Sequence, residues 1–462
     1  MQIMRSEKNI AKAVPGLGFK LLKRYIRICH NDFYYRKVYW LNTENIPEEC
    51  PLMIVSDHQN GLSDVLGILM SIRSRNKRKI KVIARADIFN TVFGSALRWL
   101  GLLPAFRTSF DGEESLANND ETFAEAENEL FNNGTVVIFP EAGHQDKRWL
   151  GKFTSGYTRI LFEAAAKSNF EKEIFVLPSC NHYSDYFTIQ EKLLIKYGTP
   201  ISIAPFYELY KTKPRTAQRQ VNALVREQIS DMMLNITDLD NYEAIDYLRN
   251  GYGVEFAKKQ GFNPDKLPDK LTADKQLFAK LENIKTTNEA ELQKIYNDVN
   301  ILKEKTEQLK IKDSDFDKKS IWNIILKGFM LALLFPIFVL AYIPNSLIFY
   351  ARRLVVSKVK NKMLQSSVTF GVSILISMPM SYCLILVLIW IRMKSLIVLF
   401  LTILFCPILG IFAWYYIKWY RNWIRGIRFH KLSGKAKMND LITLRTNINE
   451  SLNRLLKQEN QI

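Results

Sequence analysis

The chain has 462 residues, enough for one large domain or two ordinary ones, which excludes a disordered peptide or a disulfide miniprotein. Its 64 Lys and Arg against 46 Asp and Glu give a formal net charge of +18, and 48% of the residues are hydrophobic. Disordered basic tails do not combine these properties, so the charge belongs to a folded protein. Basic proteins of this size usually bind nucleic acid or an anionic membrane.

The N-terminal segment 1–45 is the first predicted element. Between residues 11 and 40, apolar side chains are interleaved with Lys20, Lys23, Arg24 and Arg27, as in a basic amphipathic helix that lies in a membrane interface. The same helix could also pack its apolar side on the soluble part of the chain. No small-residue cleavage site follows an apolar core, so we predict no signal peptide and a cytoplasmic N-terminal part.

Residues 46–210 are predicted to form an α/β domain. Short β-rich runs alternate with helical segments, which indicates a central, mostly parallel sheet flanked by helices. These runs are 51–55, 80–84, 135–139, 174–178 and 193–197. Polar or turn residues follow the apolar strands, so we expect functional side chains at the strand ends.

A histidine and an aspartate, His58 and Asp64, follow the first of these strands. An aspartate that accepts a hydrogen bond from Nδ1 of a histidine leaves Nε2 to take a proton, which is the make-up of a general base with its orienting group. Such spacing also arises by chance, and Asp64 could be a plain helix cap, so the pair needs support from other motifs.

Three further motifs follow in order. They are LPAFR, which ends at Arg107, FPEAG, which contains Glu141 and Gly143, and VLPS, which contains Pro178. With the His58 motif they resemble, in order and spacing, the glycerophosphate acyltransferase superfamily, the PlsC-like enzymes. That family has a His-x4-Asp motif, an Arg after an aromatic residue, FPEG, and an apolar strand that ends in Pro. The resemblance covers about residues 50–205.

The sequence departs from the family pattern at two places. Five residues separate His58 from Asp64, an extra residue that also occurs in a branch resembling fungal glycerol-3-phosphate and dihydroxyacetone-phosphate acyltransferases. Ala142 stands where the family has Gly, although Gly143 offers the same backbone freedom one residue later. The first departure bears on the acceptor more than on the chemistry.

The resemblance implies a role for each motif residue. His58 would deprotonate the acceptor hydroxyl, with Asp64 as its orienting group, and Arg107 would hold the acceptor phosphate. The acceptor site would also include Glu141, Gly143 and Lys152. Acyl transfer from a thioester needs no metal and no cofactor, so acyl-CoA or acyl carrier protein enters as the donor substrate.

The expected partners are membrane lipids, the acyl thioester donor and acyl carrier protein, with no nucleic acid. Acyl carrier protein is a candidate because its acidic surface would suit a cluster of basic residues. This cluster consists of Arg73, Arg75, Lys77, Arg78, Lys79, Lys81 and Arg85. A solvated helix end would explain the same charges without any partner.

The remainder of the chain is predicted to be helical. Residues 211–320 are expected to form a charged, solvated helical arm, with helices over 215–235 and 240–260 and a longer one over 269–312 that breaks near 286–288. A transmembrane module over 321–430 and a basic cytoplasmic tail over 431–462 complete the chain. The five scattered cysteines have no zinc spacing, which indicates a reduced, cytoplasmic setting.

Three charge-free stretches carry the membrane prediction: 328–351, 365–391 and 395–417. Each is long enough to cross roughly 30 Å of hydrocarbon. The loop after the first stretch is strongly basic, so three full crossings would place it outside, against the positive-inside rule. Because the first stretch contains Pro336 and Pro344, we expect it to re-enter, which leaves both basic segments and the catalytic domain on the cytoplasmic face.

The sequence therefore predicts a membrane-bound acyltransferase that acts on glycerol 3-phosphate or 1-acylglycerol 3-phosphate in phospholipid synthesis. Dihydroxyacetone phosphate, a lysophospholipid or an amino-acid lipid are alternative acceptors. A lipid-binding membrane scaffold whose acyltransferase domain is inactive is the alternative from another class of protein.

Overall fold

The structure of the chain is a computed structural model, which describes residues 16–72, 80–90, 94–106, 119–141, 147–316, 320–360 and 362–459. It divides into two compact units, and each is described by itself. The first contains the described residues up to Asn235 together with Val359–Phe370. The second contains Ile236–Lys358 and the described residues from Gly371 onward.

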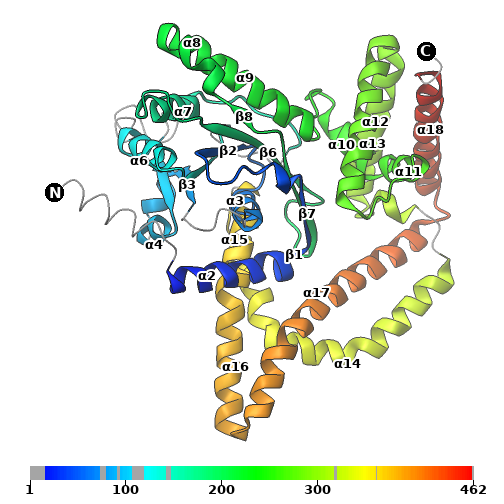
Figure 1. The fold of residues 1–462 in the computed structure, drawn as a ribbon. Helices are drawn as coiled ribbons and strands as arrows, with labels where there is room; N and C mark the ends of the chain where they lie inside the picture. The colour runs from blue at the N-terminus through cyan, green and yellow to red at the C-terminus, as the bar shows by residue number, and fades with distance from the viewer. Residues whose placement is uncertain are drawn as a thin grey trace. The chain divides into compact units, whose positions relative to one another are not determined.

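A twisted sheet forms the centre of the first unit (Figure 1). Its strands are β1 (Tyr35–Leu41), β2 (Leu52–Ser56), β3 (Lys81–Arg85), β4 (Leu102–Ala105), β5 (Thr135–Ile138), β6 (Phe175–Tyr183), β7 (Glu191–Tyr197) and β8 (Ile201–Ser202). They run in the order β1-β7-β6-β2-β5-β3-β4, with β8 paired to β6. Only the pairs that β6 makes with β7 and β8 are antiparallel among the described strands. This mostly parallel sheet confirms the predicted α/β fold class.

Helices cover the sheet because its central strands are apolar on both sides. Every residue of β2 is buried. Met53 and Val55 of this strand pack in the hydrophobic core cluster that also contains residues of α6, α7 and α9. A strand buried on both faces is typical of a parallel sheet with helices on each side. The helices of this unit are α2 (Leu17–Ile28), α3 (Leu62–Ser71), α4 (Gly94–Trp99), α6 (Asn119–Phe131), α7 (Gly156–Ala166), α8 (Tyr207–Thr212), α9 (Pro214–Met232) and α15 (Lys362–Thr369).

The N-terminal helix is shorter than its sequence pattern predicts. The basic amphipathic pattern over 11–40 gives a helix only as far as Ile28, followed by a π-helical turn and then β1. β1 pairs in parallel with β7 and begins at the buried Tyr35. Pairing with a neighbouring strand outweighs local helix preference here, since residues 35–41 are rich in aromatic residues that favour strands.

The second unit contains a helical bundle where a solvated arm is expected from the sequence. The helices of this bundle are α10 (Tyr242–Asn250), α11 (Tyr252–Lys259), α12 (Leu267–Thr287), α13 (Glu289–Gln308) and α18 (Ala436–Glu459). The break predicted near 286–288 is confirmed at Asn288, between α12 and α13. The prediction of a solvated arm is wrong about exposure, because the C-terminal helix α18 packs on α12 and α13 and buries side chains such as Leu441 and Leu452.

Within the described residues, three helices are long and apolar enough to cross a membrane: Ile321–Val356, Leu364–Met393 and Leu396–Leu432. They contain the three charge-free stretches, apart from Ser395 at the start of the third. The first is formed mainly by α14 (Ile321–Ala351), the second includes α16 (Met378–Met393), and the third is α17 (Leu396–Leu432). α14 remains helical through Pro336 and Pro344 and is visibly bent (Figure 1). Its re-entry into one side of the membrane stays a prediction.

Candidate active site

Two predicted site residues follow two neighbouring strands, and a third strand lies beside one of these. His58 follows β2, Glu141 follows β5, and β6 ends at Tyr183. Because β2 pairs in parallel with both β5 and β6, the carboxyl ends of all three strands lie at the same edge of the sheet. This edge is where open α/β sheets place their ligand and catalytic groups.

The loop after β2 brings His58 and Asp64 into contact. Nδ1 of His58 lies 2.9 Å from Oδ2 of Asp64. The chain turns into α3 at Gly61, whose φ of 54° is a left-handed conformation that favours glycine. The His58 side chain is 17% exposed and that of Asp64 is fully buried, so the imidazole faces outward from a sealed carboxylate. In the tautomer that donates from Nδ1 to the carboxylate, Nε2 is the proton acceptor.

Asp64 is held by more than the histidine. The backbone N–H groups of Gln59 and Asn60 donate to its Oδ2, each at 2.8 Å. The hydroxyl of Tyr183 donates to Oδ1. Burial and the neighbouring charge of Asp64 raise the pKa of Tyr183, which keeps this hydroxyl a protonated donor. The carboxylate therefore has a fixed orientation toward His58.

Glu141 connects the His58 loop to the segment that precedes α7. Its Oε1 accepts a hydrogen bond from the His58 backbone N–H at 2.8 Å, and its Oε2 accepts one from the Gly151 N–H at 2.8 Å. Burial raises the pKa of Glu141, and these two donors offset part of that rise. The ring of Phe139 packs beside the imidazole of His58, with 4.5 Å between the ring centroids. Glu141 thus holds the backbone of His58, and Phe139 packs beside its ring.

Asp57 is a buried acid that sequence reasoning did not single out. Its Oδ1 accepts a hydrogen bond from the Asn181 backbone N–H at 2.8 Å, which joins the end of β2 to β6. Burial, followed by the charges of Asp64 and Glu141, raises the pKa of Asp57. Asp57, Asp64 and Glu141 thus lie close enough for their charges to act on one another.

The predicted phosphate-binding residues are described only in part. Arg107 and Gly143 lie outside the described residues, as do five members of the basic cluster, Arg73, Arg75, Lys77, Arg78 and Lys79. Lys152 is described and exposed, one residue after the Gly151 that contacts Glu141. The placement of Lys152 leaves its ammonium in solvent beside the site.

A second arginine, Arg148, lies in the same region and is buried. Its guanidinium donates to the Tyr183 carbonyl at 2.9 Å and lies 5.1 Å from the ring centre of Tyr186. Within the described ranges no group of three His, Cys, Asp or Glu side chains could hold a metal ion.

A segment from far along the chain completes the first unit. Residues Val359–Phe370, which lie between two of the apolar helices in sequence, pack with the sheet domain. Oγ of Ser367 accepts a hydrogen bond from the Leu62 N–H at 3.0 Å, at the first residue of α3. The neighbouring Ser366 pairs through its Oγ with the Tyr34 hydroxyl at 2.8 Å. No sequence motif pointed to this contact.

Part of the chain is similar to known acyltransferases. Residues 37–181 match the family model described as Acyltransferase. The chain is 28% identical over 146 residues to a curated relative, "Glycerol-3-phosphate O-acyltransferase 2" of Saccharomyces cerevisiae, a match that covers 31% of this chain and 19% of the relative. The chain thus spans about a fifth of that relative's length.

Among solved structures, the chain is similar to the 1-acyl-sn-glycerophosphate acyltransferase PlsC of Thermotoga maritima, with 16% identity and a TM-score of 0.34. That similarity covers 46% of this chain and 78% of the other. A likeness at this level carries no conclusion by itself.

The sheet, the His58 loop and the matched family model together define an acyltransferase domain. The match of residues 37–181 to the Acyltransferase family model and the similarity to a glycerol-3-phosphate O-acyltransferase confirm the resemblance inferred from the four motifs.

Proposed function

We propose that this protein is a membrane-bound O-acyltransferase that moves a fatty acyl chain from acyl-CoA or acyl carrier protein to glycerol 3-phosphate or 1-acylglycerol 3-phosphate. The contact between Nδ1 of His58 and Oδ2 of Asp64, at the strand edge of a matched acyltransferase domain, carries the proposal. The name of the yeast relative favours glycerol 3-phosphate as the acceptor.

In the proposed reaction Nε2 of His58 takes the proton of the acceptor hydroxyl as the oxygen attacks the thioester carbonyl. The tetrahedral intermediate then collapses, the carbon–sulfur bond breaks, and the imidazolium returns the proton to the leaving thiolate. Asp64 stabilises the imidazolium through the Nδ1 contact. No covalent acyl-enzyme is formed, so the protein's work is to position the base and to stabilise charge.

Arg107 and Lys152 are the proposed ligands of the acceptor phosphate, and Glu141 and Gly143 complete the acceptor site. Lys152 is suited to this role because it is exposed directly after a residue that Glu141 holds. A guanidinium grips a phosphate through two parallel hydrogen bonds, whereas a lysine acts as a point charge. Replacement of Arg107 should therefore raise KM for the acceptor more than replacement of Lys152.

The three apolar helices support membrane attachment, and we propose that the catalytic domain faces the cytoplasm. The acyl chain of the donor and the product both partition into lipid, so a site held at the bilayer shortens the path of each. A single cysteine introduced at Lys360 in a cysteine-free variant tests the orientation. Labelling only from the non-cytoplasmic face would contradict both the cytoplasmic orientation of the catalytic domain and the re-entry of the first apolar stretch.

The function is tested with purified full-length wild type and His58→Ala in detergent. Each is supplied with acyl-CoA or acyl carrier protein and, in parallel, with glycerol 3-phosphate, 1-acylglycerol 3-phosphate, dihydroxyacetone phosphate and a lysophospholipid, and the lipid product is followed. We expect turnover with a glycerophosphate acceptor and a loss of at least about a hundredfold in His58→Ala. His430→Ala, an exposed histidine of the second unit, is the matched control and should keep wild-type turnover.

Other outcomes separate the alternatives. A preference for dihydroxyacetone phosphate, a lysophospholipid or an amino-acid lipid would change the acceptor and keep the enzyme class. Folded wild-type protein that binds lipid but forms no product with any acceptor would replace the proposal with a membrane scaffold.

A further inference from the structure

A pocket of about 320 Å³ lies between α14 and α17 in the second unit, and none of the proposed catalytic residues lines it. Asn323, Lys327, Leu331 and Leu334 line it from α14, at intervals of three or four residues that share one helix face. Trp419 and Asn422 line it from α17. Each helix contributes a continuous strip of side chains to the pocket.

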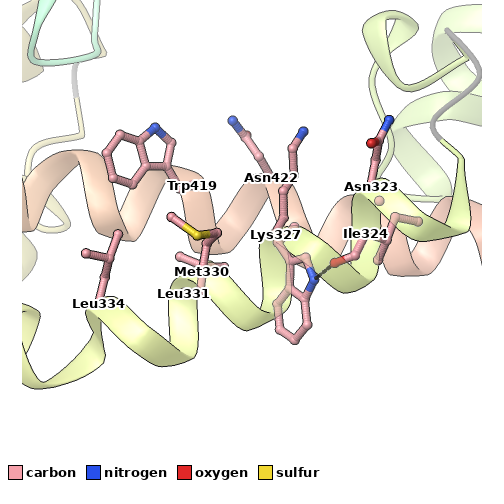
Figure 2. A pocket seen from close by; sticks show the side chains of 10 residues that line it. Asn323, Ile324, Lys327, Met330, Leu331, Leu334, Trp419 and Asn422 are labelled. Carbon is pink, nitrogen blue, oxygen red and sulfur yellow. Dashed lines mark hydrogen bonds between the residues drawn. The ribbon is translucent and has the colours of Figure 1, made fainter.

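The pocket is polar at one end and apolar at the other. Figure 2 shows the polar ends of Asn323, Lys327 and Asn422 pointing to the same side of the helix pair, with Leu334 at the opposite end of the row. Lys327 is the single charged residue of the lining, which contains no carboxylate. From Asn323 to Leu334 the strip rises through eleven residues of helix, roughly 16 Å. An occupant that matches it has a negatively charged, hydrogen-bonding end and an apolar end.

Packing holds the two helices in this arrangement. The indole N–H of Trp423 donates to the Ile324 carbonyl at 2.9 Å, and the Tyr416 hydroxyl donates to the Leu331 carbonyl at 2.9 Å. A Cβ at Gly328 would lie 2.9 Å from the Trp423 ring, so only glycine at this position lets the ring pack on α14. The pocket is therefore built into the contact between α14 and α17.

The pocket also lies where the apolar parts of both helices end. On α14, Asn323 and Lys327 precede the charge-free stretch that starts at residue 328, and Leu331 and Leu334 lie within it. On α17 the charge-free stretch ends at residue 417, just before Trp419. Tryptophan and lysine at such positions are typical of the membrane–water interface.

We propose that this pocket binds an anionic glycerophospholipid, with the lipid phosphate at Lys327, Asn323 and Asn422 and the start of an acyl chain along Leu331 and Leu334. The apolar end distinguishes a lipid from free phosphate or glycerol 3-phosphate, because a small polar ion would leave that end unfilled. The lone cation and the absence of a carboxylate from the lining favour an anionic headgroup over a zwitterionic one, since an ammonium on the lipid would face Lys327. The site is distinct from the acyl-transfer site and does not require turnover.

The test uses the purified full-length chain in a nonionic detergent and a photoactivatable phosphatidic acid whose diazirine is near the carboxyl end of one acyl chain. A phosphatidylcholine with the same acyl chains is the comparison lipid. Cross-linked peptides are mapped by mass spectrometry, and glycerol 3-phosphate or inorganic phosphate is added as a competitor. We expect phosphatidic acid to label peptides from 321–334 and 414–426 and the two small phosphates not to displace it.

Three variants isolate the charge. Lys327→Met keeps an unbranched side chain of nearly the same length and should reduce labelling by phosphatidic acid about tenfold, because it removes a charge-assisted contact with the phosphate. Lys327→Arg keeps the charge and should restore labelling. Lys394→Met removes a lysine that lies between α16 and α17, outside the pocket lining, and should change nothing.

Three results would contradict the lipid-binding proposal. Equal labelling of the two peptides by both lipids, or full labelling of Lys327→Met, would show only the surrounding annular lipid and overturn the proposal. Displacement by inorganic phosphate would assign the polar end to a free anion instead. Because cross-linking does not depend on turnover, these outcomes stay separate from the fate of the acyltransferase proposal.

Discussion

The hydroxyl of Tyr183 donates a hydrogen bond to Oδ1 of Asp64, the carboxylate whose Oδ2 contacts His58. Tyr183 is fully buried at the end of β6, so this bond ties the proposed base to the strand next to its own. A carboxylate with both oxygens engaged has one orientation, and through it the imidazole has one orientation. Tyr183 is thus a positioning residue that does not touch the reacting atoms.

Replacement of this tyrosine should slow turnover while the protein stays folded. In Tyr183→Phe we expect kcat to fall about tenfold with little change in KM, because one hydrogen bond to a charged group is lost and the ring remains. Steady-state kinetics of the purified variant measures both parameters.

Tyr186→Phe is the matched control for that variant. Its hydroxyl donates to the Gln59 side chain at 2.7 Å, in the same loop but away from the carboxylate. We expect kcat to fall less than in Tyr183→Phe. Equal behaviour of the two variants would mean that Tyr183 contributes packing alone.

Glu141 should act mainly through the backbone it holds. Its two oxygens accept from the N–H groups of His58 and Gly151, and the amide of Glu141→Gln can replace only one of these acceptors. The unsatisfied N–H should weaken the loop and lower kcat about tenfold or more, with a smaller rise in KM for the acceptor. Glu163→Gln, which changes an acid of α7 that bonds Tyr210, is the control. A variant with unchanged kcat and a raised acceptor KM would instead assign Glu141 to direct acceptor binding.

The motifs of the first unit could be predicted from sequence because they are local. β2, β5 and β6 are short apolar runs, and the residues that follow them carry the chemistry, so His58, Asp64 and Glu141 were identified without any knowledge of contacts. β1 could not be predicted in this way, since its place depends on β7, more than 150 residues later, and the basic pattern before it favours a helix. Tyr183 is equally hidden, because its partner Asp64 is 119 residues away.

The burial of the arm and of α18 could not be predicted for a different reason. The charge of these segments is high enough to mask the periodic apolar residues, such as Leu441, Ile448 and Leu452, that bury one face of α18. Ion pairs such as Arg445 with Asp313 at 2.8 Å and Lys280 with Glu459 at 2.5 Å also use charges that appear solvated in the sequence. A domain boundary at residue 320 would separate the sheet domain from residues 359–370, which pack with it.

Loss of the Ser367 hydroxyl should impair the loop that carries His58. Ser367 caps the Leu62 N–H of α3, a helix whose preceding residue, Gly61, offers no side chain for this purpose. In Ser367→Ala we expect kcat to fall about fivefold, in line with the cost of about 1 kcal/mol of a lost helix cap, and Ser367→Thr to recover most of it. Kinetics of the purified variants measures this.

Ser433→Ala removes a hydroxyl that bonds only the His430 carbonyl near the end of α17, so it serves as the control and should behave as wild type. Hydrogen exchange of the 57–64 loop adds a second readout, which should speed up in Ser367→Ala and not in Ser433→Ala. Unchanged exchange and unchanged kcat in Ser367→Ala would reduce the 359–370 segment to a passive connection.

His30 should make the first unit sensitive to acid. Its ring is fully buried, packed against Tyr35 with 4.9 Å between centroids and against Phe370 with 5.6 Å, and its Nδ1 lies 2.7 Å from Oδ1 of Asn31. Burial lowers the pKa of His30 to about 4. An unfolded histidine titrates near 6.5, so between these two values the unfolded chain binds a proton that the folded chain does not. The free energy of unfolding therefore falls as the pH drops from about 6.5 toward 4.

The size of this effect follows from the two pKa values. At about pH 5 the loss attributable to His30 is roughly 2 kcal/mol, and above about pH 7 it vanishes. His30→Phe removes the titration and keeps an aromatic ring between Tyr35 and Phe370. Urea unfolding is monitored by hydrogen exchange of peptides from β2 and β6, at about pH 7.5 and about pH 5. The two measurements give the change in the free energy of unfolding for each protein. The wild type should lose about 2 kcal/mol more than His30→Phe between the two conditions, and equal losses would mean that His30 is hydrated or protonated in the folded chain.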